Sequence, residues 1–180
     1  THEGGLAFAE RQQAWILREW QRLEHRPAAR DTGTEIWYRG ERVRLAVSGS
    51  EVVLAGLRLK RPQVDTGIRQ TVEKYLREIA EVELPARLAV LVAERRLSTP
   101  RVTVRNQRSR WGSCSTRGSI ALNWRVIQMP PSVADYIMRH ELAHRRQPKH
   151  SPSFVGEVES LCPTWKDSER WLRKNGKELL

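Results

Sequence analysis

The sequence predicts an α+β protein in which a helix carrying an HExxH motif lies beside a small mixed sheet. Apolar residues alternate with polar ones between residues 35 and 60, which is the period of a half-buried strand. Later segments return to helical spacing and are separated by short clusters of Pro, Gly and Ser. We expect residues 1–65 to form an N-terminal helix with antiparallel strands and residues 66–180 to carry the site, both within one domain.

The first half of the chain predicts helices on both sides of a small sheet. Residues 6–23 have apolar side chains at helical spacing, and residues 67–80 repeat that pattern. Between them, the alternation over residues 35–60 indicates a small antiparallel sheet. A separate helix is expected from about residue 85 to residue 97, because Pro85 suits the first turn of a helix.

The second half begins with two expected strands and a helix. Residues 102–104 and 119–124 have strand character and flank a loop at residues 108–114. The sequence Pro130-Pro131-Ser132 then opens a helix, for which Ser132 is the expected N-cap.

Two further helices are expected after this one. Ser151 and Pro152 have the residue types preferred at the N-cap and first position of a helix, which stops at Cys162-Pro163. A last helix is expected from Asp167 to Asn175-Gly176, a sequence typical of a helix C-terminus.

The composition is that of a basic globular protein. Hydrophobic residues make up 39% and charged residues 29% of the chain, which indicates a folded rather than a disordered protein. No apolar run is long enough to span a bilayer, so we expect no membrane association. The net charge of +11 and the pI near 10.6 indicate either an anionic partner such as nucleic acid or a generally basic surface.

The cysteines and the start of the chain set two more expectations. Cys114 and Cys162 are far apart and form no CxxC pair, so we expect a reducing compartment, the cytoplasm. The chain starts at Thr1 and its first segment already has helical spacing, so we expect that residues before it have been removed.

The sequence His140-Glu141-Leu142-Ala143-His144 is an HExxH motif on an expected helix. Residues i and i+4 lie one turn apart on the same helix face, so both imidazoles can bind one zinc ion. Glu141 projects beside them and can take a proton from water and pass it to a leaving group. The motif therefore predicts a zinc-dependent hydrolase with Glu141 as the general base.

A catalytic zinc site needs a third protein ligand and one open position. His150 follows His144 by the same number of residues that separates the second and third histidines of the long HExxHxxGxxH pattern. Gln147-Pro148 occupies the turn in which that pattern has glycine, so the turn must differ in geometry. Glu157 and Glu159 on the following helix are the alternative third ligands, and an exposed loop histidine is the alternative role for His150.

Four successive segments resemble the YgjP-like metal-dependent hydrolases, relatives of the SprT-like and WLM zincins: residues 108–115, residues 120–125, the HELAH motif and His150-Ser151. HExxH is common to many zincins, whereas the RWGSC sequence joined to it is much more specific. The resemblance covers residues 101–176 strongly and the upstream region more loosely. It implies a zincin-like catalytic region and a metal bound by His140, His144 and His150.

The resemblance also suggests how a substrate binds. Zincins commonly lay a peptide along an edge strand beside the active-site helix, and residues 119–124 are the expected strand. Asn123 and Arg110 are then expected to line the cleft, although Asn123 has the alternative role of capping a turn. Trp111 is expected in the core.

Three hydrolase functions are compatible with these residues. The first is a metallopeptidase that acts on a peptide or protein. The second is hydrolysis of a nucleotide phosphoanhydride, because residues 95–111 contain six arginines and no acid, and arginine suits phosphate. The third is a nucleic-acid-associated protease like the SprT-like relatives, with these arginines contacting DNA. A purely structural zinc is disfavoured, because such sites usually close with four Cys or His ligands.

Overall fold

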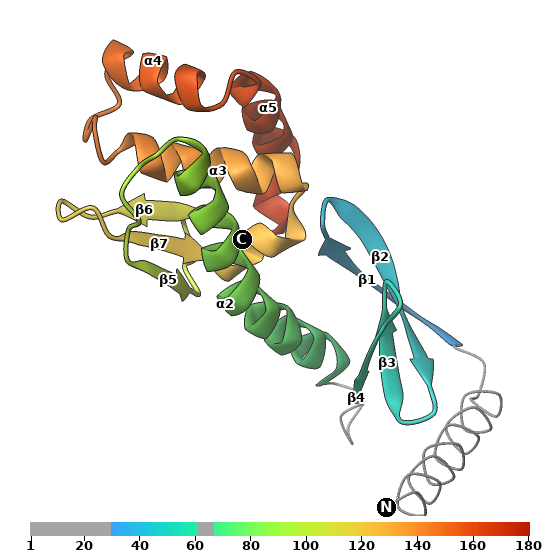
Figure 1. Cartoon of the computed structure of the whole chain (residues 1–180). Helices are drawn as coiled ribbons and strands as arrows, with labels where there is room; N and C mark the ends of the chain where they lie inside the picture. Colours follow the sequence, from blue (N-terminus) through green and yellow to red (C-terminus); the bar gives the residue numbers. More distant parts are fainter. Residues whose placement is uncertain (1–29, 61–66) are drawn as a thin grey trace, which may run out of the picture.

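The structure, a computed structural model, is α+β and describes residues 30–60 and 67–180 (Figure 1). The helix expected at residues 6–23 lies outside the described residues. Two sheets are present in the described chain, and one long helix runs between them. The α+β class and the helix beside a small mixed sheet, both expected from the sequence, are confirmed.

The first sheet is a four-stranded antiparallel meander with the order β1-β2-β3-β4, as expected. Every second residue of a strand faces the inner side of this sheet, and the side chains there are buried, including Leu45, Val52 and Leu54. This arrangement explains the period-two pattern of the sequence. The strand bounds are β1 Arg30–Tyr38, β2 Glu41–Ser48, β3 Glu51–Leu54 and β4 Leu57–Lys60.

The turn between β1 and β2 attaches this sheet to the second half of the chain. Gly40 has a φ of 89°, and its N–H donates to the carbonyl of Gln128 at 2.8 Å. A Cβ on Gly40 would lie 2.5 Å from the ring of Pro130, just before the HExxH helix. Only glycine therefore permits both the backbone conformation and the close approach.

Helix α2, Ile68–Glu94, is continuous, so the expectation of two helices divided near Pro85 is wrong. Pro85 lies inside the helix, where it removes one main-chain donor. Leu76, Ala80, Leu84 and Leu88 form a buried stripe that passes through this position without a break. Burial of one continuous apolar face stabilises the helix on both sides of the proline, and this outweighs the local cost.

The second sheet has three strands, β5 Val102–Arg105, β6 Gly112–Cys114 and β7 Ile120–Asn123, in the order β5-β7-β6. β5 runs parallel to β7, and β6 runs antiparallel to it, so the sheet is mixed. Helix α2 contacts both β3 of the first sheet and β5 of the second (Figure 1).

Three shorter α-helices and two short 3-10 helices complete the described chain: η2 Trp124–Gln128, α3 Pro131–Ala143, α4 Pro152–Leu161, α5 Trp165–Asn175 and η3 Gly176–Glu178. Ser132 was expected as the N-cap of α3, but Pro130 occupies that position and Pro131 is the first helical residue. Proline lacks only an N–H that has no partner in the first turn of a helix, so the earlier start costs nothing. The expected Ser151 cap of α4 is confirmed, and α5 begins two residues before Asp167.

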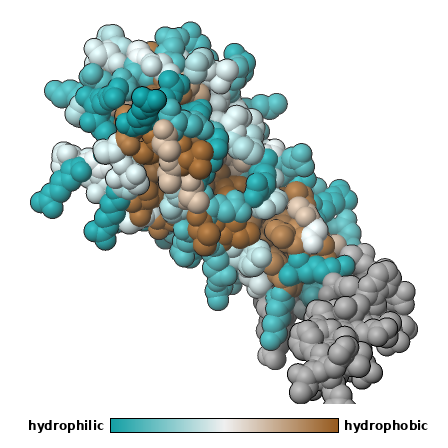
Figure 2. Space-filling view, viewed as in Figure 1, coloured by the Kyte–Doolittle hydropathy of each residue, from teal (hydrophilic) through white to brown (hydrophobic). Residues whose placement is uncertain are grey.

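The core is a single apolar cluster shared by both sheets and the helices packed on them. It includes Leu54 from the first sheet, Leu88 from α2, Leu122 from the second sheet and Met138 from α3, all fully buried or nearly so. In Figure 2, hydrophobic residues form a band along the middle of one face, bordered by hydrophilic residues. Of the helices in residues 67–180, none combines the length and apolar content needed to cross a bilayer.

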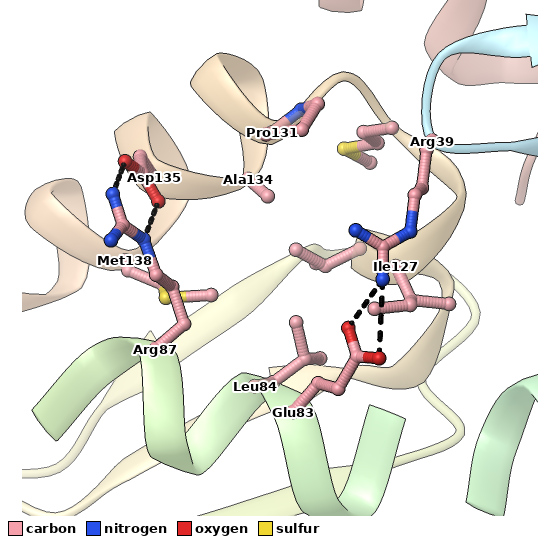
Figure 3. A pocket seen from close by; sticks show the side chains of 11 residues that line it. Arg39, Glu83, Leu84, Arg87, Ile127, Pro131, Ala134, Asp135 and Met138 are labelled. Carbon is pink, nitrogen blue, oxygen red and sulfur yellow. Dashed lines mark hydrogen bonds and ion pairs between the residues drawn. The ribbon is translucent and has the colours of Figure 1, made fainter. Parts of the chain in front are cut away.

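Two ion pairs fix α3 and the first sheet to α2 around a small apolar hollow of about 140 Å³ (Figure 3). Arg87 on α2 binds Asp135 on α3 through Nε at 2.8 Å and a terminal nitrogen at 2.5 Å. Arg39, in the β1–β2 turn, binds both carboxylate oxygens of Glu83 on α2. The helix that carries the HExxH motif is thus held by a two-point charged contact as well as by burial.

Candidate metal centre

Three histidines converge at the C-terminal end of α3. His140 and His144 lie one turn apart on that helix, and His150 comes from the segment between α3 and α4. Their ligand nitrogens all lie within 4.8 Å of one another, and Nε2 of His150 is 3.3 Å from Nε2 of His140. The structure thus brings together the three histidines that the sequence singled out.

The turn that returns His150 to the cluster does not need the glycine of the longer pattern. After α3, the N–H groups of Arg145 and Arg146 bond to carbonyls three residues back, which tightens the end of the helix. Pro148 has no N–H to continue it, and Ser151 then closes a short turn on the carbonyl of Lys149 at 2.8 Å. Residues 145–150 all keep a negative φ, so Gln147 fits where a left-handed turn would require glycine.

The ring of His144 is oriented by the same turn. Its Nδ1 lies 3.2 Å from the carbonyl oxygen of Gln147. An N–H at Nδ1 donates to that carbonyl, which leaves the lone pair of Nε2 free for a metal ion. Gln147 therefore contributes through its main chain, which explains why the identity of its side chain gave no signal in the sequence.

Phe154 on α4 forms the apolar base of the cluster. Its ring is stacked on His144, with centroids 4.4 Å apart and an interplanar angle of 28°. It meets His140 and His150 edge to face, with centroid distances of 4.9 and 4.7 Å. The Ser151 side chain accepts a bond from the N–H of Phe154, so the cap of α4 also positions this ring. Residue spacing alone does not indicate this contact between Phe154 and the histidines.

The donor set fits a metal ion such as zinc. Burial, reinforced by the neighbouring histidines, lowers the pKa of His140 to about 4. Burial also lowers the pKa of His144, and a charge on His150 would lower it further. Both imidazoles are therefore neutral at physiological pH, which is the form that binds a metal. Three imidazole donors are a ligand set found in catalytic zinc sites.

Glu141 is buried, with 6% of its surface exposed, and lies against strand β6. Burial raises the pKa of its carboxyl group to about 7, opposed by the positive charge of Arg110. A Cβ on Gly112 would lie 2.7 Å from both Cγ and Oε1 of Glu141. The carboxylate therefore occupies space that only glycine leaves open, and no local sequence pattern indicates this contact.

These groups face a cavity of about 510 Å³ between α3, β6 and the β6–β7 turn. Glu141 is the only acid among the described residues that line it. Arg145 forms part of the wall, where it donates to the carbonyl of Ser98 at 2.5 Å and to its hydroxyl at 2.8 Å. Gly118 packs against the Arg145 guanidinium, so this side chain also supports the turn that borders the cavity.

The two alternative third ligands on α4 lie outside the histidine cluster. Glu157 pairs with Arg146 at 3.2 Å and is not part of the histidine cluster. Glu159 is exposed and also lies outside the cluster. The geometry therefore favours His150 as the third ligand.

Asn123 and Arg110, both expected to line the cleft, differ in burial: Asn123 is buried and Arg110 is exposed. Asn123 is fully buried, and its Nδ2 donates to the carbonyls of Gln107 and Arg110 at 2.9 and 3.1 Å. Its Oδ1 accepts from the N–H of Arg125, so Asn123 caps η2 and shapes the preceding loop. Arg110 is exposed, and its charge reaches Glu141. Trp111 is partly buried and packs against the core.

The expected substrate strand is not an edge strand. Residues 120–123 form β7, which lies between β5 and β6, so its main-chain groups are already paired on both sides. The edge strand beside α3 is β6. The carbonyl of Trp111 accepts from the N–H of Asn123, and the N–H of Ser115 donates to the carbonyl of Ser119. Because alternate residues of an antiparallel strand direct their main-chain groups to opposite sides, those of Gly112 and Cys114 point away from β7. The sequence alternation of β7 does not distinguish a central from an edge strand, because both have a period of two.

A cluster of three histidines with a buried carboxylate alongside is an arrangement found in metal-dependent hydrolases. The chain belongs to the YgjP-like metallopeptidase family: the family model described as "YgjP-like, metallopeptidase domain" matches residues 2–175. The chain is therefore, at the level of its family, a metal-dependent peptidase.

The chain is also similar to a solved structure, the crystal structure of the metallopeptidase zymogen of Pyrococcus abyssi abylysin. The two are 26% identical, and the match covers 51% of this chain and 91% of that one with a TM-score of 0.42. No curated protein shows significant similarity to the chain.

Proposed function

We propose that this protein is a zinc-dependent peptidase in which His140, His144 and His150 hold the metal and Glu141 is the general base. The observation that carries the proposal is the convergence of the three ligand nitrogens within 4.8 Å of one another, beside a carboxylate whose pKa is raised to about 7. When bound, zinc supplies Lewis acidity, which polarises a substrate carbonyl and makes a water molecule acidic near neutral pH.

The carboxylate of Glu141 is suited to moving a proton in both directions. A group with a pKa of about 7 accepts a proton from the attacking water and then releases it to the leaving amine of the peptide. Gly112 allows β6 to approach this carboxylate closely, so an extended chain on β6 passes directly beside it.

The free edge of β6 offers a place for that chain. The main-chain groups of Gly112 and Cys114 are directed away from β7, and a peptide that pairs with them extends the sheet by one strand. Main-chain pairing recognises any extended peptide, so it supports a peptide substrate over a nucleotide. Membership of a metallopeptidase family favours the same conclusion.

Substitution of Glu141 by Gln tests the role of the base. Peptide cleavage should fall by about two to four orders of magnitude, the usual contribution of a general base. Zinc content, measured by metal analysis after dialysis, should stay near one ion per chain, because Glu141 is not a ligand. Full activity in Glu141→Gln would refute the assignment.

Substitution of His150 by Ala tests the third ligand. The affinity for zinc, measured by competition with a chromophoric chelator, should fall sharply in His150→Ala and stay unchanged in Glu157→Ala. The reverse result would move the third ligand to α4.

A substrate panel separates the peptidase from the two alternatives. Unfolded protein, nucleoside triphosphates and a DNA-bound protein are each incubated with the zinc-loaded enzyme, with and without chelator. We expect chelator-sensitive cleavage of the unfolded protein. Cleavage of nucleotides alone would replace the peptidase proposal, and cleavage only of the DNA-bound protein would favour the nucleic-acid-associated protease.

A further inference from the structure

A second cavity, of about 520 Å³, lies on the open face of the three-stranded sheet. Its floor is made of short side chains, because Thr103, Ala121 and Ser113 lie in one row across β5, β7 and β6. Longer side chains line its border: Arg101 lies just before β5 and Arg105 at the end of β5, two residues on either side of Thr103. We call this hollow with its arginines the basic trough.

The arginines of the basic trough lack the partners that arginines have elsewhere. Arg44 pairs with Asp31 and Glu35 on the first sheet, and Arg87 pairs with Asp135 between helices. The trough arginines are Arg101, Arg105 and Arg110. Within residues 30–60 and 67–180, none of the three forms an ion pair, and no acidic residue lines the trough. Uncompensated like charges around a concave surface repel one another, and an anionic ligand would relieve that repulsion.

The basic trough and the metal-site cavity share a wall. Ser113, Cys114 and Ser115 line both, so β6 separates them and its free edge borders each. A peptide paired with that edge continues the pleat of the sheet, so its side chains point alternately to the two faces. Every second side chain then lies on the open face, nearest the trough. Arg110, two residues before β6, lines the trough on the same side.

The lining of the trough favours a peptide over a nucleic acid. Proteins that bind single-stranded nucleic acid use aromatic side chains on which the bases stack. Among the described residues that line the trough none is aromatic, and its floor of Thr, Ala and Ser offers no stacking surface. Carboxylate side chains need only the guanidinium groups, which bind them through paired hydrogen bonds.

We propose that the basic trough selects acidic segments of a polypeptide substrate, with Asp or Glu at alternate positions beside the bond that is cut. This inference rests on the proposed peptidase function and adds the substrate class to it. Arg101 and Arg105 act as specificity residues, which contact acidic side chains of the substrate and not the reacting bond itself. Arg110 is closer to Glu141 and influences both substrate and base.

The test uses three quenched fluorescent peptides that differ only at two alternate positions, which are Glu, Gln or Lys. The zinc-loaded wild-type protein should cleave the Glu peptide with a kcat/KM about five to ten times that of the Gln peptide, mainly through KM. The preference should shrink as salt is raised from 0.05 to 0.5 M, since exposed charges are screened. Cleavage of the Lys peptide should be slowest.

Variants assign the preference to the trough. In the double variant Arg101→Ala/Arg105→Ala, the Glu and Gln peptides should be cleaved within about twofold of each other. The matched control is Arg170→Ala/Arg173→Ala on α5, which removes the same charge from exposed positions away from both cavities and should keep the full preference. Arg105→Glu should shift the preference toward the Lys peptide.

A binding measurement separates this inference from the proposed function. Fluorescence anisotropy with Glu141→Gln compares binding of the three peptides while cleavage is slow, and the Glu peptide should bind tightest. Equal binding of all three overturns the inference but leaves the peptidase intact. If single-stranded DNA binds more tightly than the Glu peptide, and the double variant weakens DNA binding alone, the trough is a nucleic-acid surface and the inference is wrong.

Discussion

Gly112 and Glu141 are in contact across the site: a Cβ at residue 112 would lie 2.7 Å from the Glu141 carboxylate oxygen Oε1. Gly112→Ala should therefore displace the carboxylate and lower kcat by at least tenfold, since small misplacements of a catalytic group have large effects. Zinc affinity should be unchanged, because the three histidines lie on other segments. Peptide turnover and metal content, measured on the same sample, check both parts.

The matched control for this change is Gly156→Ala. A Cβ on Gly156, in the middle of α4, meets no atom within 4 Å. Alanine there should raise the free energy of unfolding by about 0.5–1 kcal/mol, since it favours the helix, and leave kcat unchanged. If Gly112→Ala keeps full activity, the contact with Glu141 has no functional weight.

Phe154→Leu should weaken zinc binding without preventing folding. Leucine keeps most of the buried volume but cannot stack on His144 as the phenyl ring does, so the three imidazoles gain freedom before they bind the metal. We expect the Kd for zinc, measured by chelator competition, to rise about tenfold. Val158→Ala, a buried change one turn further along α4, should reduce stability and leave the Kd unchanged.

The Arg87–Asp135 pair should contribute more to stability than an exposed pair does. Asp135 is largely buried, with 13% of its side chain exposed, so Arg87→Ala leaves it without a partner. The free energy of unfolding from urea titration should fall by about 1–2 kcal/mol. The exposed pair between Arg170 and Asp167 is the control, and Arg170→Ala should cost less than about 0.5 kcal/mol. Equal losses in the two variants would contradict the buried character of the first pair.

The thiol of Cys114 should react slowly near neutral pH. Burial raises its pKa above the ordinary value, and the negative charge of Glu141 raises it further, opposed by Arg145. Because the thiolate is the reactive form, alkylation of the metal-free protein by iodoacetamide should be slow at pH 8 and accelerate only as the pH exceeds the usual thiol pKa. Glu141→Gln removes the anionic neighbour and should speed alkylation at pH 8, with Cys114→Ser as the blank. A rate at pH 8 equal to that of a free cysteine would refute the shift.

Local spacing in the sequence was sufficient to predict the histidine pair, the Ser151 cap and the antiparallel sheet. Each of these depends on residues within a few positions of one another, where helix and strand periods are decisive. The contact between Gly112 and Glu141 joins residues far apart in the chain, as does the pair between Arg87 and Asp135. No local pattern encodes them.

The errors at Pro85 and β7 have a related origin. Pro85 has the properties of a helix start, but a continuous buried stripe holds α2 together across it. Residues 120–123 have the alternation of a strand, but only the pairing with β5 and β6 makes that strand central. In both cases the packing of distant segments decides between structures that are locally equivalent.

Helix α2 has a consequence for how the protein denatures. It contributes buried side chains along most of its length, from Val72 to Val92, and it contacts both sheets. Neither sheet can lose its packing without exposing part of this one helix, and a helix that loses a portion of its apolar support is marginal in water. The described part of the chain should consequently melt in one cooperative transition. The metal centre should then lose its structure at the same temperature as the first sheet.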